Sequence, residues 1–297
     1  MENYNYFCRN NKYLMQKLSF SGHETFVCKQ YWLKKGIDFV RQKGSFNQES
    51  SVVSLGVGKN MVVSIKYWLK SFNLLDNHDN LTELAKYIFG SKGKDPYIED
   101  IGTIWLLHYN LVKTAKATIY NMFFNEFSKD YNFFEKEHIT KYILNILRDL
   151  DIKNINTNTI DKDINVLLRS YYKDETSKDI EEDSVILLSE LEIIKKEKKS
   201  YYLNYENKQD IPENIFLFAI LEFLSKDEST VSINRISFSN SSPGRIFLLN
   251  KHDVIEKIRL LEAKYKGIVY SSQAGVETIQ FKKSIDKWKV LDDYYNS

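Results

Sequence analysis

Cysteine, proline and glycine are scarce in this sequence. Of its 297 residues, two are cysteine, three are proline and 11 are glycine. Cys8 and Cys28 cannot build a disulfide framework, and no other residues join them at zinc-ligand spacing, so we expect no structural metal. The shortage of helix-breaking residues favours long helices and excludes collagen-like or low-complexity segments.

Long apolar runs and a surplus of one charge are also missing. No stretch approaches the roughly 18 apolar residues that span a bilayer, and the polar start MENYNYFCRNNKY has no signal-peptide core. We therefore expect a cytoplasmic protein with no membrane contact. The 42 Lys and Arg residues against 40 Asp and Glu leave a net charge of +2, which excludes a uniformly polybasic protein but not a local basic face.

Motifs of common enzyme chemistry are lacking too. The sequence has no nucleotide phosphate loop, no dinucleotide-binding glycine pattern and no nucleophile elbow. A metal-dependent nuclease needs an Asp and a Glu-x-Lys on neighbouring strands, and only Asp183 with Glu197 and Lys199 lies near a hairpin, where Glu197 would occupy the tip. We predict a non-enzymatic protein without catalytic residues or cofactors; a nuclease-like effector is the second alternative.

What the chain does have is ample core-forming material in about two domains, or three small ones. Of its residues, 43% are apolar and 14% aromatic. The polar run 204–212 is the best linker, and a softer boundary lies near 128–132. We therefore predict an N-terminal helix-turn-helix and helical domain (1–130), a second winged-helix-like unit (131–208) and a C-terminal winged-helix-like unit (211–297).

The clearest secondary-structure pattern in the sequence runs from residue 50 to residue 75. A short apolar helix with Val52, Val53 and Leu55 breaks at glycines 56 and 58, and a longer helix follows from Asn60 to Phe72. Four apolar residues of this second helix share one face, which predicts a buried stripe: Met61, Ile65, Trp68 and Phe72. With a strand beginning at Leu74, the pattern predicts a winged helix-turn-helix.

Two later segments repeat the order helix, helix, short apolar strand, turn, strand. In the first, helices in 138–150 and 159–172 precede a hairpin that turns at residues 198–200. In the second, helices in 213–225 and 251–265 precede a hairpin that turns at 273–275. The predicted fold is therefore mainly α (α+β): a helical bundle with two or three winged units, each with a short β-hairpin.

Basic and polar residues on two of these helices are candidate nucleic-acid contacts. On the helix from Asn60 to Phe72, the face opposite the buried stripe is predicted to carry Lys59, Lys66 and Lys70. Ser64 and Tyr67 are predicted to lie adjacent to this face, and Asn60 at the helix start is a further candidate contact. On the helix 251–265, Asn250 and Asp253 form a capping box, and Lys257 and Lys264 face outward. Solvated lysines or a protein interface explain both patterns equally simply, and Glu256 and Glu262 favour solvation on the second helix.

Two dense polar segments receive structural explanations. In Ser21-Gly22-His23-Glu24-Thr25-Phe26, neighbouring Ser, His and Glu side chains diverge and cannot form a triad, so we predict that Ser21 caps a helix and Glu24 closes the capping box. In 95–100 the carboxylates of Asp95, Glu99 and Asp100 are of the ligand type that a hard cation prefers. No ligand-loop spacing supports this, and we predict that Glu99 and Asp100 lie at the start of the helix carrying His108 and complement its dipole.

Four motifs taken in order resemble a bacterial family, the domain of unknown function 4007 family, over roughly residues 17–285. They are SFSGHETFVCKQYWLKKGIDF, LGVGKNMVVSIKYWLKSFNLL, IFGSKGKDPYIEDIGTIWLLHYNLV and FFNEF. The resemblance implies genomic company with phosphoadenosine-phosphosulfate-reductase-like enzymes of DNA phosphorothioation and phage-defence clusters. It supplies no catalytic residues.

Together, the helix pattern and this resemblance predict a DNA-associated reader or adaptor that contacts double-stranded DNA and other defence-system proteins, such as the reductase-like enzyme. The first alternative is a scaffold subunit of the same system whose winged units bind partner proteins and never touch DNA.

Overall fold

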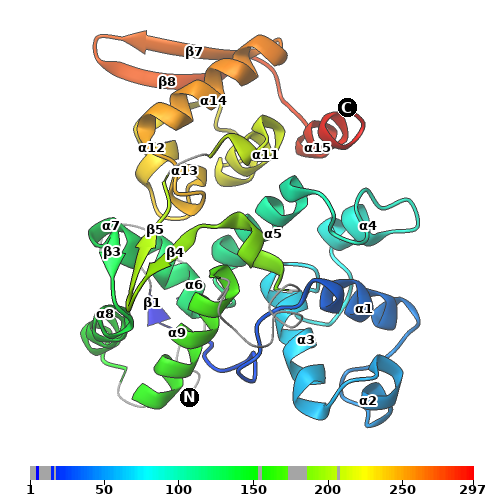
Figure 1. Cartoon of the computed structure of the whole chain (residues 1–297). Helices are drawn as coiled ribbons and strands as arrows, with labels where there is room; N and C mark the ends of the chain where they lie inside the picture. Colours follow the sequence, from blue (N-terminus) through cyan, green and yellow to red (C-terminus); the bar gives the residue numbers. More distant parts are fainter. Residues whose placement is uncertain (1–4, 7–14, 17, 153–155, 173–185, 206–207) are drawn as a thin grey trace. The chain divides into compact units, whose positions relative to one another are not determined.

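The computed structural model describes residues 5–6, 15–16, 18–152, 156–172, 186–205 and 208–297. It is a mixed α+β chain in which helices predominate and the sheets are small and antiparallel (Figure 1). Two compact units make up the chain: Met1–Glu99 with Asn110–Leu203, and Asp100–Tyr109 with Asn204–Ser297. Unit 1 thus contains most of the two predicted domains 1–130 and 131–208, and helix α5 (Ile101–Thr114) contributes to both units.

The first part of unit 1 contains four helices: α1 (Gln30–Arg41), α2 (Ser50–Leu55), α3 (Lys59–Ser71) and α4 (Glu83–Phe89). Helix α2 ends where Gly56 takes a left-handed φ of 60°, and α3 starts at Lys59. The two predicted helices with a glycine turn between them are therefore present. Within the described residues, an isolated bridge between Leu75 and Leu81 stands where a strand was expected, so the predicted wing after α3 is wrong.

The predicted apolar stripe of α3 lies in the core. Ile65, Trp68 and Phe72 have no exposed surface, while Met61 at the helix start is half-buried. The indole Nε1 of Trp68 donates a hydrogen bond to the Phe26 carbonyl at 3.2 Å, so its polar group is satisfied as well.

The second part of unit 1 surrounds a three-stranded antiparallel sheet with the order β3-β5-β4. The strands are β3 (Phe133–Phe134), β4 (Ile194–Glu197) and β5 (Ser200–Leu203); β4 and β5 form the predicted hairpin. Short helices lead into it: α6 (Thr118–Met122), the π-helical turn Phe123–Phe127 and α7 (Ser128–Asp130). Helices α8 (Lys136–Asp149) and α9 (Thr157–Tyr171) lie between β3 and the 3-10 turn Leu187–Leu191. A separate strand pair, β1 (Asn5–Tyr6) and β2 (Met15–Gln16), completes the unit.

Unit 2 contains a three-stranded antiparallel sheet with the same pairing pattern, in the order β6-β8-β7. Its strands are β6 (Thr230–Ser232), β7 (Ile268–Gln273) and β8 (Val276–Phe281). Its helices are the 3-10 turn Lys208–Asp210, α11 (Glu213–Phe223), α12 (Ile233–Phe238), α13 (Pro243–Ile246), α14 (Lys251–Lys264) and α15 (Lys287–Tyr295). The hairpin turns at Ala274 and Gly275, both with positive φ, as the predicted turn at 273–275 requires. Among the described helices, none is long and apolar enough to cross a membrane.

Candidate nucleic-acid interface

The predicted basic face of α3 is partly neutralised within the protein. Lys59 and Asn60 are exposed in its first turn. Lys66 and Lys70 instead share one carboxylate, since their Nζ atoms lie 2.7 and 2.6 Å from the two oxygens of Asp79. Partial burial opposes ionisation of Asp79, but the two ammonium groups outweigh it and hold the pKa of this carboxyl below its usual value. The face therefore offers less positive charge than its three lysines suggest.

Two of the predicted contacts on α3 are turned inward. Ser64 has no exposed surface, and the hydroxyl of Tyr67 is buried even though its residue is half-buried. Burial raises the pKa of the Tyr67 phenol, and the Asp163 carboxylate raises it further. The expectation that Ser64 and the Tyr67 hydroxyl reach DNA is wrong. A core-facing stripe covers more than 100° of a helix, and Ser64 lies at the border of that arc. Tyr67 lies beyond it, with its ring packed edge to face against His23 and Trp68.

Helix α14 departs from expectation at one of its two candidates. The capping box of Asn250 and Asp253 is confirmed. Lys257, however, is only 6% exposed, and its Nζ donates to the Ile211 carbonyl at 2.6 Å. Burial lowers the pKa of this ammonium, while nearby carboxylates oppose the shift. Lys257 is therefore an interior residue, not an outward-facing one. Lys264 is exposed, and its Nζ donates to Asn214 Oδ1 at 2.6 Å.

The polar segment 21–26 is a tight turn, not the start of a helix. Ser21, Glu24 and Thr25 have φ values of 61°, 49° and 68°, and the next helix begins only at Gln30. The predicted capping box of Ser21 and Glu24 is therefore wrong. Left-handed φ is uncommon for residues with a side chain, and a run of such residues persists only where the surroundings fix it.

Buried contacts with α9 fix this turn. The His23 Nε2 lies 3.1 Å from Asp163 Oδ1, and the Ser21 backbone N–H donates to the same carboxylate at 2.9 Å. The other ring nitrogen of His23 accepts from the Thr25 N–H at 3.1 Å, which places the imidazole proton on Nε2, toward Asp163. Glycine at position 22 allows this close packing, because a Cβ there would lie 2.3 Å from the Tyr67 ring and would force the ring to move.

The opposite face of α9 is exposed and carries no acidic side chain. Its exposed residues are Thr157, Asn158, Lys162, Asn165 and Arg169. The last four follow one another at spacings of four, three and four residues, so they form one stripe along the helix. The half-buried Asp161 accepts from the Thr140 hydroxyl at 2.8 Å, on the side toward α8. In the described part of the chain, Lys162 and Arg169 make no ion pair.

The β4–β5 hairpin extends this basic stripe. Lys198 and Lys199 form its exposed turn, beside Glu197. The Lys196 ammonium lies over the ring of Tyr172, 5.4 Å from its centroid, and Tyr172 directly follows α9. The hairpin and the end of α9 are therefore neighbours (Figure 1). Lys195 is partly neutralised by Glu192 at 3.6 Å.

The sequence carried signals of this surface that our predictions left unused. The helix and the hairpin were both predicted, but the stripe of Lys162, Asn165 and Arg169 and the run KKEKK at 195–199 were not treated as a contact surface. The link between Asp163 and His23 joins residues 140 positions apart, and no local pattern reveals it.

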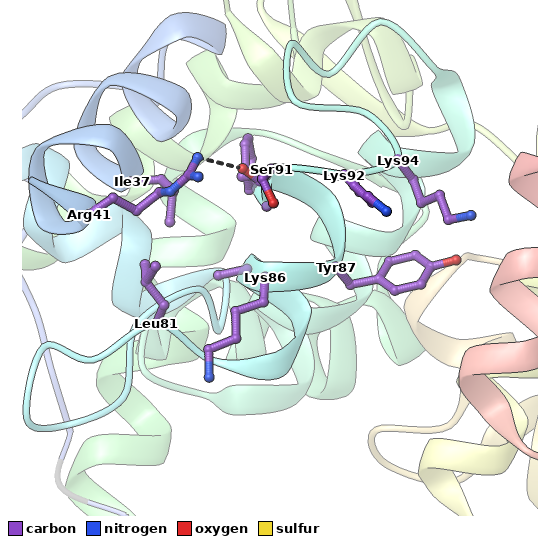
Figure 2. A pocket seen from close by; sticks show the side chains of 11 residues that line it. Ile37, Arg41, Leu81, Lys86, Tyr87, Ser91, Lys92 and Lys94 are labelled. Atoms are coloured by element: carbon purple, nitrogen blue, oxygen red, sulfur yellow. Dashed lines mark hydrogen bonds between the residues drawn. The ribbon is translucent and has the colours of Figure 1, made fainter.

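Unit 1 also contains an open cavity of about 500 Å³ between α1, α4 and the loop after α4. Ile37, Ala85 and Phe89 line its apolar floor. Figure 2 shows Arg41 on one side and Lys92 and Lys94 on the other, with their charged ends pointing in different directions. Arg41 donates to the Phe89 carbonyl at 3.2 Å. The cations surround this cavity without converging on one point.

The acidic segment 95–100 accepts hydrogen bonds from backbone N–H groups, and the predicted place of Asp100 at the start of α5 is confirmed. Asp95 Oδ1 accepts from the Glu99 N–H at 2.9 Å, and Asp100 Oδ1 accepts from the Thr103 N–H at 3.2 Å, in the first turn of α5. No group of three or more His, Cys, Asp or Glu side chains suited to a metal ion occurs among the described residues. Of the nuclease-like set, Asp183 lies outside the described residues, and Glu197 is at the hairpin tip, as predicted.

Comparisons with known proteins identify both a family and a fold. A family model described as a protein of unknown function (DUF4007) matches residues 20–295. No curated protein matches the sequence. The magnesium-ion-bound crystal structure of SspB is similar, with a TM-score of 0.82 and 22% identity, covering 94% of this chain and 88% of that one. A second SspB crystal structure gives a TM-score of 0.81 and 23% identity over the same shares of both chains. At this identity the likeness establishes the fold.

Proposed function

This chain belongs to the DUF4007 family, and from that premise we propose that it is a non-enzymatic, DNA-associated reader or adaptor. Its setting is a bacterial DNA-modification system of the phosphorothioation type, or a phage-defence system. The family resemblance supports this setting, since it implies company with phosphoadenosine-phosphosulfate-reductase-like enzymes. The similarity of its fold to that of SspB is consistent with this setting.

One observation carries the DNA-binding part of this proposal: the order of elements around each three-stranded sheet. In unit 1 a strand, two helices and a hairpin follow one another, and the last strand pairs with the first (β3-β5-β4). In unit 2 a strand, three helices (α12, α13 and α14) and a hairpin follow one another, and the last strand again pairs with the first (β6-β8-β7). We assign both as winged helix-turn-helix units, in which the helix before the hairpin, α9 or α14, is the one that enters the major groove.

Titration of duplex DNA at two salt concentrations tests the proposal. A DNA-associated protein that neutralises phosphates releases counterions, so its affinity falls steeply with salt. We expect measurable binding at about 50 mM salt and a loss of at least tenfold at about 200 mM, the range in which a few phosphate contacts act. Absence of binding at the lower concentration would reject the DNA-associated function.

A protein scaffold is the second candidate, and the surface of α14 favours it. The exposed face of this helix mixes Glu256 and Glu262 with Arg259 and Lys264, and it includes Leu260, which is 54% exposed. Mixed charge around an exposed apolar side chain suits a protein partner better than a phosphate backbone. Co-purification with the reductase-like protein, together with absent duplex binding, would establish this alternative.

A nuclease-like effector remains the third candidate, because one of the similar SspB structures contains a magnesium ion. The test is direct: supercoiled plasmid is incubated with the protein and Mg²⁺, and nicked or linear products are measured on a gel. The proposed reader leaves the plasmid intact. Nicking that disappears with EDTA would assign an enzyme.

A further inference from the structure

We infer that the exposed stripe of α9 and the β4–β5 hairpin form the principal DNA-contact surface, and that α3 does not. The α9–hairpin surface consists of Asn158, Lys162, Asn165 and Arg169 on α9 and Lys196, Lys198 and Lys199 on the hairpin. This inference rests on the proposed function and names the surface through which it acts.

The balance of charge favours this surface over α3. Five of its seven residues are cationic and the other two are asparagines, while Glu197 lies between Lys196 and Lys198 in the hairpin. On α3, by contrast, Asp79 neutralises much of the charge of Lys66 and Lys70. Phosphate binding depends on cations that release counterions on contact, so a lysine already paired with a carboxylate contributes less.

The arrangement of the α9–hairpin surface matches a duplex groove. Lys162, Asn165 and Arg169 follow one another on one side of the helix, and the Lys196 ammonium over the Tyr172 ring holds the hairpin beside the end of that helix. Lysine and arginine at the flanks position the protein on phosphates. The carboxamides of Asn158 and Asn165 are the side-chain type that binds the N6 and N7 edge of adenine.

The same geometry selects DNA over double-stranded RNA. An α-helix fits the major groove of B-form DNA, which is about 12 Å wide, whereas the major groove of A-form RNA is too deep and narrow for side chains to read. A helix whose exposed side chains are Asn, Lys and Arg needs such groove access to use its carboxamides. Duplex DNA is therefore the partner that we assign to this surface.

The buried side of α9 fixes the exposed side in place. Asp163, on the inner face, binds both His23 and the Ser21 backbone. Substitutions of the outward residues do not disturb these contacts, so their effect on binding is separable from any effect on folding.

Two charge-matched triple variants of the full chain test the inference. The first is Lys162→Gln, Arg169→Gln, Lys199→Gln; the second is Lys59→Gln, Lys66→Gln, Lys70→Gln on α3. Each removes three positive charges. We expect the first to lower duplex affinity on the order of 100-fold near 0.1 M salt and to reduce the slope of log K against log salt by about 3, whereas the second changes the slope by less than 1. Circular dichroism and thermal unfolding establish that both variants are folded.

The outcomes separate this inference from the proposed function. If the parent binds duplex DNA and the first variant binds equally well with the same slope, the α9–hairpin assignment is wrong while the function stands. If the α3 variant alone loses binding, α3 is the contact helix. If the parent binds no duplex at any salt concentration, function and surface fail together. Equal competition by double-stranded RNA would overturn the groove assignment.

Discussion

The His23 Nε2 and the Asp163 Oδ1 lie 3.1 Å apart, with side-chain exposures of 0% and 1%. This contact joins a turn with three left-handed residues to the middle of α9. One side of α9 is therefore held by buried polar contacts, while the other side presents Lys162, Asn165 and Arg169 to solvent. The buried side of α9 therefore stabilises the fold, and the exposed side is the proposed DNA-contact side. Substitutions on the two sides should affect stability and DNA binding separately.

Asp163→Ala should destabilise the protein strongly. It removes the acceptor of the Ser21 N–H and the partner of the His23 Nε2 in a site with no access to water. Each buried group left unpaired costs about 1–3 kcal/mol, so we expect the free energy of unfolding to fall by about 3 kcal/mol or more. Urea unfolding followed by circular dichroism measures the change.

Asp161→Ala, two residues earlier, is the matched control. Asp161 is half-buried and accepts one hydrogen bond, from Thr140, so we expect a loss of about 1 kcal/mol. Equal destabilisation by the two substitutions would show that the buried contact between His23 and Asp163 stabilises the protein no more than the hydrogen bond of Asp161 does.

Gly22→Ala should also destabilise unit 1. A Cβ at this position would lie 2.3 Å from Tyr67 Cδ2, and that ring contacts Trp68 edge to face at 5.3 Å. Forcing such a ring aside costs about 1–3 kcal/mol. Gly58→Ala is the comparison, because a Cβ there meets nothing within 4 Å and the change at an N-cap costs at most about 1 kcal/mol. Thermal unfolding of the two variants, measured side by side, compares their losses of stability. A larger loss of stability for Gly58→Ala than for Gly22→Ala would contradict the prediction.

Trp68→Ala should cost about 3–5 kcal/mol, the usual range for removing a fully buried aromatic side chain. Trp68 has no exposed surface and packs against Phe72 and Tyr120, with ring centroids 5.8 Å from each. The half-buried Trp288 is the comparison, and we expect a smaller loss on its replacement by Ala. Chemical unfolding of both variants measures the difference; equal losses would place Trp68 outside the core.

Stability should fall in mildly acidic solution because of His108. Burial lowers its pKa to about 3, although its hydrogen bond to the Ile246 carbonyl opposes the shift. The unfolded chain has an ordinary histidine pKa of about 6.5. Between pH 6.5 and 3 the unfolded state therefore binds a proton that the folded state rejects, so the free energy of unfolding falls as the pH falls through this window.

The matched test compares His108→Gln with His252→Gln, since His252 is 77% exposed. Thermal midpoints measured from pH 7 to pH 4.5 should decline less steeply in His108→Gln than in the parent. In His252→Gln they should decline as steeply as in the parent. The same slope in the parent and in His108→Gln would assign the acid sensitivity to other groups.

The periodic spacing of apolar residues predicts the core well, but it predicts only part of the surface. The spacing of Ile65, Trp68 and Phe72 predicts a buried stripe because apolar side chains separated by about one turn must share a face. The predicted exposure of Ser64 and Lys257 is wrong, because a polar side chain on an amphipathic helix need not lie on its solvent-facing side. Lys257 lies between the core residues Val254 and Leu261, and inside the protein its ammonium donates a hydrogen bond to the Ile211 carbonyl. Ser64 lies one turn before Trp68 and is carried into the core with it.

Long-range partners lay beyond any local pattern. Asp79 lies nine residues beyond Lys70 and was not recognised as the neutralising group, and Asp163 lies 140 residues from His23. Sequence spacing reports which side chains share an element, but it does not report which elements meet. The two hairpins of the later segments are confirmed because hairpin turns carry strong local signals, whereas the expected wing after α3 rested only on Leu74 and Leu75.

The most direct test of the account is a lysine-reactivity footprint of the whole protein with and without saturating duplex DNA, read by peptide mass spectrometry. Acetylation should fall on DNA binding at Lys162 and Lys199, while exposed Lys35 on α1 and Lys59 on α3 keep their reactivity. Protection at Lys59 with unchanged reactivity at Lys162 and Lys199, or no protection at any of these lysines, would contradict the DNA-contact surface placed on α9 and its hairpin.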